Sequence, residues 1–157
     1  MAKGIEKRMA RPATQLGALI HDCARIRRTV IDKALKPIGI TRAQRWVLIA
    51  LAGFDDRGVS QKELADEMGI GQVAIGERLA YLEAMGCIER VTDARDRRQR
   101  VIVLTGHGRD ILAQSWDLSD GVNRTIFEGV SAAEVEAARS VLSRLRANLI
   151  RAGQELG

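Results

Sequence analysis

The chain has 157 residues, of which 46% are hydrophobic and 29% charged, and its formal net charge is +5. This length favours one ordinary domain or two very small ones, with enough chain to bury a core. The composition excludes a disordered chain, a collagen-like repeat and a disulfide-dense scaffold, because the hydrophobic content is high and only two residues are cysteine.

The start of the chain and its cysteines predict a cytoplasmic protein. Residues 1–15 carry charges without a following apolar stretch, and no window of about 18 uninterrupted apolar residues occurs. Cys23 and Cys87 lie far apart and lack CxxC spacing, which argues against a disulfide or a zinc site. We therefore interpret both cysteines first as buried small hydrophobic residues, and we expect no cofactor and no membrane partner.

Arginine dominates the basic residues, with 20 of the 25. Its planar guanidinium suits phosphates and base edges better than a lysine ammonium does. Residues 90–100 contain five arginines and two aspartates, a local charge of +3. A charge run alone fits a solvated loop as well as a nucleic-acid contact, so its structural context decides between them.

Side-chain caps predict where several helices begin. In a capping box, a Ser or Thr and the Glu or Gln three residues later each satisfy a backbone N–H group. Three pairs fit this pattern: Thr41 with Gln44, Ser60 with Glu63, and Ser131 with Glu134. Thr105 fits as a lone cap. Upstream, residues 14–35 carry apolar side chains at the spacing of one helix face, and Pro37 and Gly39 close that helix.

Two helices joined by a glycine turn predict a helix-turn-helix. The first helix runs from Ser60 to about Met68, and the turn covers residues 69–71. The second, or recognition, helix ends at Gly86, a residue favoured just beyond a helix. Its buried side is predicted at Ile75, Leu79 and Leu82. The opposite side is predicted to carry Val73, Ala74, Glu77 and Tyr81, with Arg78 at its edge.

Residues 87–91 and 100–104 are rich in β-formers and predict a hairpin with arginines at its tip. The helical period returns over residues 105–129 and 131–151. We predict a mainly α fold with a small β-hairpin wing. The single domain, 1–157, comprises a winged helix-turn-helix lobe at 41–104 and a helical lobe at 12–38 and 105–154. The apolar stripes of the helical lobe exceed what the small lobe covers, which predicts a partner chain.

These features together resemble the MarR family of bacterial winged helix-turn-helix regulators, from about Gln15 to Arg151. The most specific part is the ordered series LEAMGCIER at 82–90, DRR at 96–98 and VIVLT at 101–105, followed by Gly108. Such a series is far more specific than a helix-turn-helix pattern alone. The resemblance implies a DNA-binding transcriptional regulator that acts as a homodimer on an inverted repeat of double-stranded DNA.

A ribbon tipped with arginine can enter the minor groove, whose narrow walls concentrate negative potential. We expect Arg97 to take that role, with Asp96 close enough to orient its guanidinium. Arg98 and Arg100 are expected to pair with Asp93 or with phosphates. The full expected DNA-binding set is Gln72, Val73, Ala74, Glu77 and Arg78 on the recognition helix and Arg95, Arg97, Arg98 and Arg100 on the wing.

The groove-facing side of the recognition helix departs from the family, which usually has Ser, Thr and Arg there. Val73 and Ala74 suit contact with a thymine methyl, and Glu77 suits a cytosine amino group. Gly76 costs about 1 kcal/mol relative to alanine inside a helix. Two interpretations of Gly76 stay open: close approach of the backbone to DNA, or simple tolerance.

Many members of the family respond to small aromatic compounds held between their two lobes. The resemblance places such an effector among Gln15, Leu19, His21, Cys23 and Arg27 on the first helix and Arg45 and Trp46 on the next. We expect a phenolic acid or aldehyde, because His21, Arg45 and Trp46 are expected to converge in one apolar cleft. The alternatives are an exposed His21, a Trp46 that only fills the core, and an Arg27 that snorkels or meets an acid.

Other function classes have less support. The histidines, His21 and His107, lie on different elements, and the sequence lacks HExxH, GxSxG and P-loop patterns, so we expect no enzyme. A redox-sensing regulator that uses Cys23 is an alternative to a repressor released by an effector. Peroxide-sensing relatives pair such a thiol with tyrosines, whereas Tyr81, the one tyrosine, lies in the recognition helix. A DNA-binding protein without an effector also fits the sequence.

Overall fold

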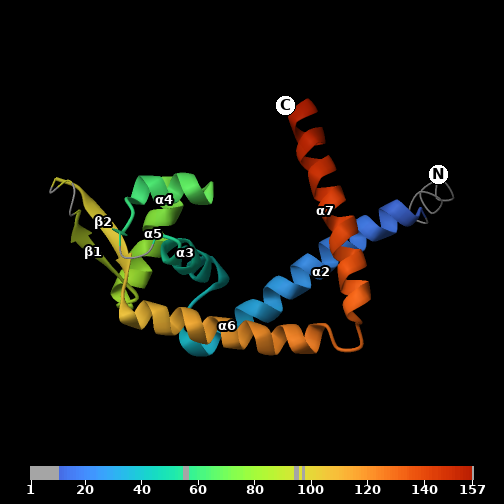
Figure 1. The fold of residues 1–157 in the computed structure, drawn as a ribbon, viewed down its shortest axis with the longest axis horizontal. Coiled ribbons are helices and arrows are strands. Elements are labelled where there is room, and N and C mark those ends of the chain that lie inside the picture. Colours follow the sequence, from blue (N-terminus) through green and yellow to red (C-terminus); the bar gives the residue numbers. More distant parts are fainter. Residues whose placement is uncertain (1–10, 55–56, 94–95, 97, 157) are drawn as a thin grey trace, which may run out of the picture. The chain divides into compact units, whose positions relative to one another are not determined.

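The computed structural model describes residues 11–54, 57–93, 96 and 98–156, so Arg95 and Arg97 lie outside the described residues. The elements follow in the order α2 (Pro12–Leu35), η1 (Lys36–Ile38), α3 (Arg42–Ala52), α4 (Gln61–Met68), α5 (Gln72–Ala84), β1 (Ile88–Thr92), β2 (Arg100–Leu104), α6 (Gly106–Ile126) and α7 (Ala132–Glu155) (Figure 1). The chain divides after Val122 into two compact units.

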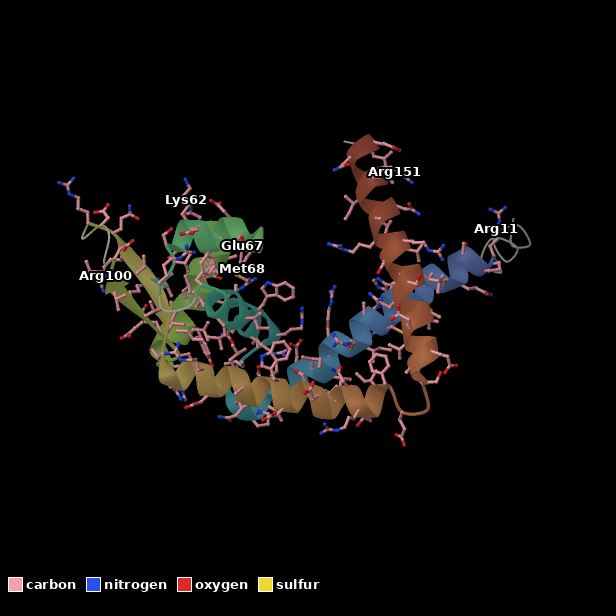
Figure 2. The ribbon with its side chains drawn as sticks, viewed as in Figure 1. Arg11, Lys62, Glu67, Met68, Arg100 and Arg151 are labelled. Carbon is pink, nitrogen blue, oxygen red and sulfur yellow. The ribbon has the colours of Figure 1, made fainter. Side chains whose placement is uncertain are left out.

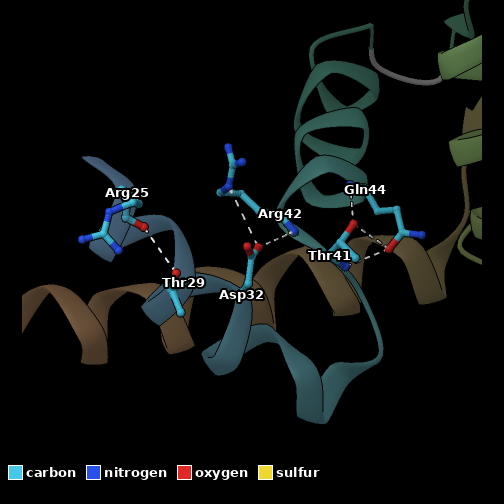
Figure 3. A network of polar contacts seen from close by, with 6 residues as sticks. All are labelled: Arg25, Thr29, Asp32, Thr41, Arg42 and Gln44. Carbon is cyan, nitrogen blue, oxygen red and sulfur yellow. Dashed lines mark hydrogen bonds and ion pairs between the residues drawn. The ribbon is translucent and has the colours of Figure 1, made fainter. Parts of the chain in front are cut away.

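Local side-chain chemistry sets the boundary between α2 and α3. Pro12 lies in the first turn of α2, where its missing N–H is not needed. Gly39, at φ +73°, reverses the chain after η1. Thr41 and Gln44 form the predicted capping box of α3 (Figure 3): the Gln44 N–H donates to Thr41 Oγ1 at 3.2 Å, and the Thr41 N–H donates to Gln44 Oε1 at 2.7 Å.

The last turns of α2 join the core of the first unit. Ile31 and Leu35 are buried there, whereas the residues from Pro12 to Val30 are exposed. Asp32 ties this end of α2 to the start of α3, because its Oδ1 accepts from the Arg42 N–H at 3.4 Å (Figure 3). The C-terminal part of α2 is therefore fixed by packing and by a polar contact.

The recognition helix α5 contributes one side to the core. Ile75, Leu79 and Leu82 are fully buried, as their spacing predicted. They belong to one cluster with residues from every other element of the lobe, including Leu64 of α4 and Ile102 of β2. Burying this side fixes which side of α5 faces outwards.

The wing is a two-stranded antiparallel sheet in which Ile88 pairs with Leu104 and Thr92 with Arg100. It projects from the helices of the lobe (Figure 1). Val59 adds a bridge to the free edge of β2, with backbone N–O distances of 3.1 and 2.8 Å to Ile102. The sequence did not predict this bridge, which anchors the segment before α4 to the wing.

A tight joint connects α5, β1 and α6. The Thr105 hydroxyl donates to the Gly86 carbonyl at 2.7 Å, and its oxygen accepts from the Gly108 N–H at 3.0 Å, as expected of a lone cap. A Cβ on Gly108 would collide with the Cys87 carbonyl oxygen and with Leu104. Glycine at 108 therefore allows α6 to lie directly on the start of the wing.

The second unit contains the end of α6 and all of α7. The predicted capping box at Ser131 and Glu134 is present, and its hydrogen bonds lower the pKa of Glu134. No residue of α7 is buried within the structure, and its apolar side remains exposed, with Leu142 at 45% and Leu149 at 72%.

Within the described ranges, every helix is too short or too polar to span a membrane.

The predicted fold class is confirmed, with two local differences, at Ser60 and at Cys23. At Ser60 the hydroxyl oxygen accepts from the Glu63 N–H, but the reciprocal bond of a full capping box is not formed. Cys87 is buried as expected, and burial raises its pKa. The prediction of a buried Cys23 is wrong: this thiol is exposed, because it lies on the part of α2 that precedes the core.

The joint at α6 gives a stability prediction. Gly108→Ala should lower the free energy of unfolding by about 1–3 kcal/mol, because the added methyl group meets backbone that cannot move cheaply. Gly106→Ala is the matched control, since a Cβ there meets nothing within 4 Å. Urea denaturation at one protein concentration checks both variants, and equal stability of the two would contradict the proposed close packing.

Candidate nucleic-acid interface

The outward side of α5 carries a mixed set of side chains. Val73 is 80% exposed, and Gln72 and Glu77 are also exposed. Ala74 and Arg78 are half-buried. This side therefore offers apolar surface for a methyl group, a carboxylate and an amide as acceptors, and a guanidinium at its edge.

Tyr81 lies on the same helix but has a structural contact. Its hydroxyl donates to the Gly39 carbonyl at 2.8 Å, which links α5 to the turn after η1. The side chain is still 45% exposed. Tyr81 thus helps fix α5 against the turn that precedes α3, a role that the helical spacing alone did not predict.

The wing turn is organised by Asp96. Its Oδ1 accepts from the Arg98 N–H at 3.0 Å, and its Oδ2 accepts from the Gln99 side chain at 3.2 Å. The expected partner of Asp96 was the guanidinium of Arg97, which lies outside the described residues, as does Arg95. Within the part that is described, Asp96 stabilises the turn that carries an exposed Arg98.

Arg100 and Arg90 meet at the base of the wing. The Arg100 guanidinium donates to the Arg90 carbonyl at 2.6 Å, while the expected pairing of Arg100 with Asp93 or a phosphate stays a prediction. Arg100 lies at the start of β2 (Figure 2). The Arg90 side chain turns inwards instead, with its Nε 3.1 Å from Glu83 Oε2 and its Nη atoms 3.4 Å from Gln61 Oε1.

Sequence reasoning missed Gln61 and Glu83 because neither carries a motif. Only Arg90 could have indicated them. It belongs to the basic run, but its position within the predicted strand places it beside the helices and not at the wing tip. The basic run therefore contains arginines with different roles. Arg90 is an internal contact between β1, α4 and α5, whereas Arg98 is exposed to solvent.

A second polar cluster surrounds Arg45 on α3. Arg45 Nε donates to Ser115 Oγ at 2.9 Å, and its guanidinium lies 4.3 Å from the centre of the Trp116 ring. Its Nη2 atom is buried and has no hydrogen-bond acceptor among the described residues. Burial chiefly lowers the pKa of Arg45 and nearby Arg27 lowers it further, while Asp120 opposes both effects.

The expected convergence of His21, Arg45 and Trp46 is not formed within the described chain. Arg45 faces Trp116 of α6, whereas Trp46 lines a cavity of about 470 Å³ with Phe54 and residues of α4. Consecutive residues of an α-helix point in directions about 100° apart, which separates Arg45 from Trp46.

The other expected effector residues lie on α2 and are exposed: Gln15, Leu19, His21, Cys23 and Arg27. Trp46 is also 60% exposed, so the interpretation of this side chain as core filling is wrong. Trp116, which was not among the expected residues, borders a cavity of about 630 Å³ together with Leu112, Leu51 and Arg109. This volume is within the range of small-molecule sites.

Comparisons with known proteins agree with this geometry. The sequence profile of the MarR family matches residues 38–99, which contain α3, α4, α5 and β1. A mutant of MarR from E. coli, solved in complex with operator DNA, is 25% identical, with 83% of this chain and 93% of that chain covered and a TM-score of 0.69.

CouR from Rhodococcus jostii RHA1, solved with bound p-coumaroyl-CoA, is 27% identical, with 87% of this chain and 94% of that chain covered and a TM-score of 0.68. A mutant of MepR from S. aureus is 23% identical with a TM-score of 0.73, over 85% of this chain and 97% of that chain. The MepR likeness concerns the fold alone. The similarities extend over most of the chain and include the helices outside the winged lobe.

The wing turn gives a prediction that needs no ligand. Asp96→Ala removes the acceptor of the Arg98 N–H, so hydrogen exchange of that amide should accelerate by about tenfold, the equivalent of one modest hydrogen bond. Asp110→Ala, which removes an exposed carboxylate from α6, is the control and should leave that amide unchanged. Unaltered exchange at Arg98 after Asp96→Ala would show that Asp96 does not hold the turn.

Proposed function

The chain belongs to the MarR family of winged helix-turn-helix regulators, and from this premise we propose a homodimeric repressor that a small aromatic effector releases from an inverted-repeat operator. Members of the family are DNA-binding transcription regulators and not enzymes. The proposal therefore concerns three finer points: which residues contact the operator, what completes the helical lobe, and which ligand acts on it.

The outward side of α5 is the observation that carries the operator-binding proposal. Its other side is buried in the core, while Val73 and Glu77 are exposed to solvent. A helix held in this way can enter the major groove with its first turns, while the wing follows the backbone into the adjacent minor groove. We assign base contacts to Gln72, Val73, Ala74, Glu77 and Arg78, and contacts to the minor groove or phosphates to Arg95, Arg97, Arg98 and Arg100.

Two substitutions separate these roles. Arg97→Ala should weaken binding by about 1–3 kcal/mol across operator sequences, whereas Glu77→Ala should change which half-site sequence is preferred. The test is selection from a random duplex library, followed by affinity measurements over a salt series. Arg144→Ala, on the side of α7 opposite Leu142 and Leu149, is the matched control for loss of one exposed arginine. An Arg97→Ala variant with wild-type affinity and salt dependence would refute the wing assignment.

The apolar side of α7 supports the homodimer. Val135, Leu142 and Leu149 are exposed along the helix, and α2 exposes Leu16, Leu19 and Ile26 before its last turns. A helix with a row of exposed apolar side chains is uncommon on the surface of a monomer. A second copy of the chain supplies the same surface, and the two-fold symmetry of such a dimer matches an inverted repeat.

Sedimentation equilibrium tests the dimer. The wild-type chain should have twice its monomer mass at micromolar concentration, and Leu142→Glu should weaken association by placing a carboxylate in the apolar contact. Ser143→Glu adds the same charge at the neighbouring exposed position and should leave the dimer intact. A folded wild-type monomer, or equal effects of the two substitutions, would contradict the proposed interface.

The cluster around Arg45 supports the effector proposal. A buried guanidinium nitrogen without an acceptor, close to a second arginine, favours an anionic or strongly accepting group. Trp116 supplies an aromatic wall, and the adjoining cavity is large enough for one substituted benzene ring. The aromatic acyl thioester bound to CouR is consistent with this ligand class. We propose that Gln15, Leu19, His21, Cys23 and Arg27 of α2 complete the site in the dimer, with Trp46 at its margin.

Calorimetry with benzoates, cinnamates and benzaldehydes tests the effector class. A releasing ligand should weaken operator binding by roughly 5–150-fold, which corresponds to a coupling of about 1–3 kcal/mol. Trp116→Leu should abolish this response and leave operator affinity without ligand nearly unchanged, whereas Trp46→Leu should reduce it less. A panel without any binding would contradict the effector proposal and favour a regulator without an effector or one that senses oxidation through Cys23.

A further inference from the structure

We propose that Gln61 is a positioning residue that fixes the wing and the recognition helix relative to each other, and that glycine at 76 lets the Gln61 amide lie closer to the α5 backbone than a Cβ would comfortably allow. The effect on operator affinity rests on the proposed operator binding by α5 and the wing. The steric part concerns the folded chain alone and can be measured without DNA.

Gln61 is the first residue of α4 and uses both ends of its amide. Its Nε2 donates to the Gln72 carbonyl at 3.3 Å, at the first turn of the recognition helix. Its Oε1 accepts from both Nη atoms of Arg90 at 3.4 Å. One half-buried side chain thus joins the start of α5 to strand β1.

Arg90 continues this connection into the wing and back to the recognition helix. Its Nε contacts Glu83 near the end of α5 at 3.1 Å, and its carbonyl accepts from the Arg100 guanidinium at 2.6 Å on the neighbouring strand. The contacts therefore form a polar chain from Gln72 through Gln61 and Arg90 to Arg100. It connects the two elements that are proposed to contact DNA.

Gly76 explains why Gln61 can take this position. A Cβ built on Gly76 would lie 3.3 Å from Gln61 Nε2, closer than ordinary van der Waals contact. An alanine at 76 would require the Gln61 amide to shift by a few tenths of an ångström, and this shift would disturb its contact with the Gln72 carbonyl. This contact gives a third interpretation of Gly76, besides close approach of the backbone to DNA and simple tolerance.

The geometry matters because the two grooves of B-DNA lie at fixed positions. The first turns of α5 and the wing must fit the major and the minor groove at the same time. The apolar core fixes α5 and the inner parts of the two wing strands, through Ile88, Ile102 and Leu104, whereas Thr92 and Arg100 at the outer ends of the strands are exposed. Polar contacts at its base are therefore well placed to set its angle to α5.

A double-mutant cycle tests both parts of the proposal. Wild type, Gln61→Ala, Gly76→Ala and the double variant are compared on one duplex, selected from a random library with the wild-type protein. Each single substitution should weaken binding about tenfold, and the double variant should bind within about twofold of Gln61→Ala. Losses that multiply to about a hundredfold would overturn the proposal, because Gly76 would then act independently of Gln61, as close approach to DNA requires.

Two further measurements separate positioning from loss of folding. Without DNA, Gly76→Ala should raise the midpoint of thermal unfolding more in the Gln61→Ala background than in wild type, because the gain in helix propensity is then unopposed. Equal shifts would overturn the steric part.

With DNA, permuting the bases outside the recognition-helix contacts should clearly weaken the binding of wild type and only slightly weaken the binding of Gln61→Ala. An unchanged dependence on these outer bases would overturn the positioning part.

Gln61→Glu adds a conservative variant that keeps an acceptor for Arg90 and loses the donor to the Gln72 carbonyl. It should restore part of the dependence on the outer bases, whereas Gln114→Ala, at an exposed glutamine of α6, should behave as wild type throughout. If Gln61→Glu behaves like Gln61→Ala, the Arg90 contact does not position the wing. If wild type selects no duplex, the proposed operator binding fails, while the thermal comparison still decides the steric part.

Discussion

One continuous apolar cluster, from Ile31 of α2 to Leu112 of α6, holds every element of the winged lobe. Hydrophobic burial is non-directional, so this cluster stabilises the lobe without defining small angles between its parts. It does fix the rotation of α5, because a helix that buries Ile75, Leu79 and Leu82 must expose the opposite side. The side of α5 that we propose to enter the major groove is therefore set by the core.

Polar contacts specify what the core leaves undetermined. Gln61 and Arg90 connect the base of the wing to the recognition helix, and Asp96 organises the turn at its tip. The Arg45 cluster differs in kind, because one of its buried nitrogens lacks an acceptor within the described chain. The hydrogen-bonded network of Gln61 and Arg90 suits a fixed geometry. The Arg45 cluster, with one nitrogen that lacks an acceptor, suits a site in which a bound ligand supplies that acceptor.

The sequence predicted those features that depend on local periodicity and capping. The capping box at Thr41 and the buried side of α5 appeared where expected, because each follows from spacing within one element. Contacts between distant residues could not be predicted in this way. The pairing of Arg45 with Trp116 depends on how α3 packs on α6, and the bridge from Val59 to Ile102 involves too few residues to show strand alternation.

The central claim is that a dimer places two recognition helices and two wings on one operator, and hydroxyl-radical footprinting of the selected duplex tests it most directly. The account predicts two protected regions related by two-fold symmetry, with centres about 10 base pairs or a multiple of that apart, each with an outer minor-groove protection made by a wing. A single protected region without symmetry, or protection confined to the major groove, would contradict it.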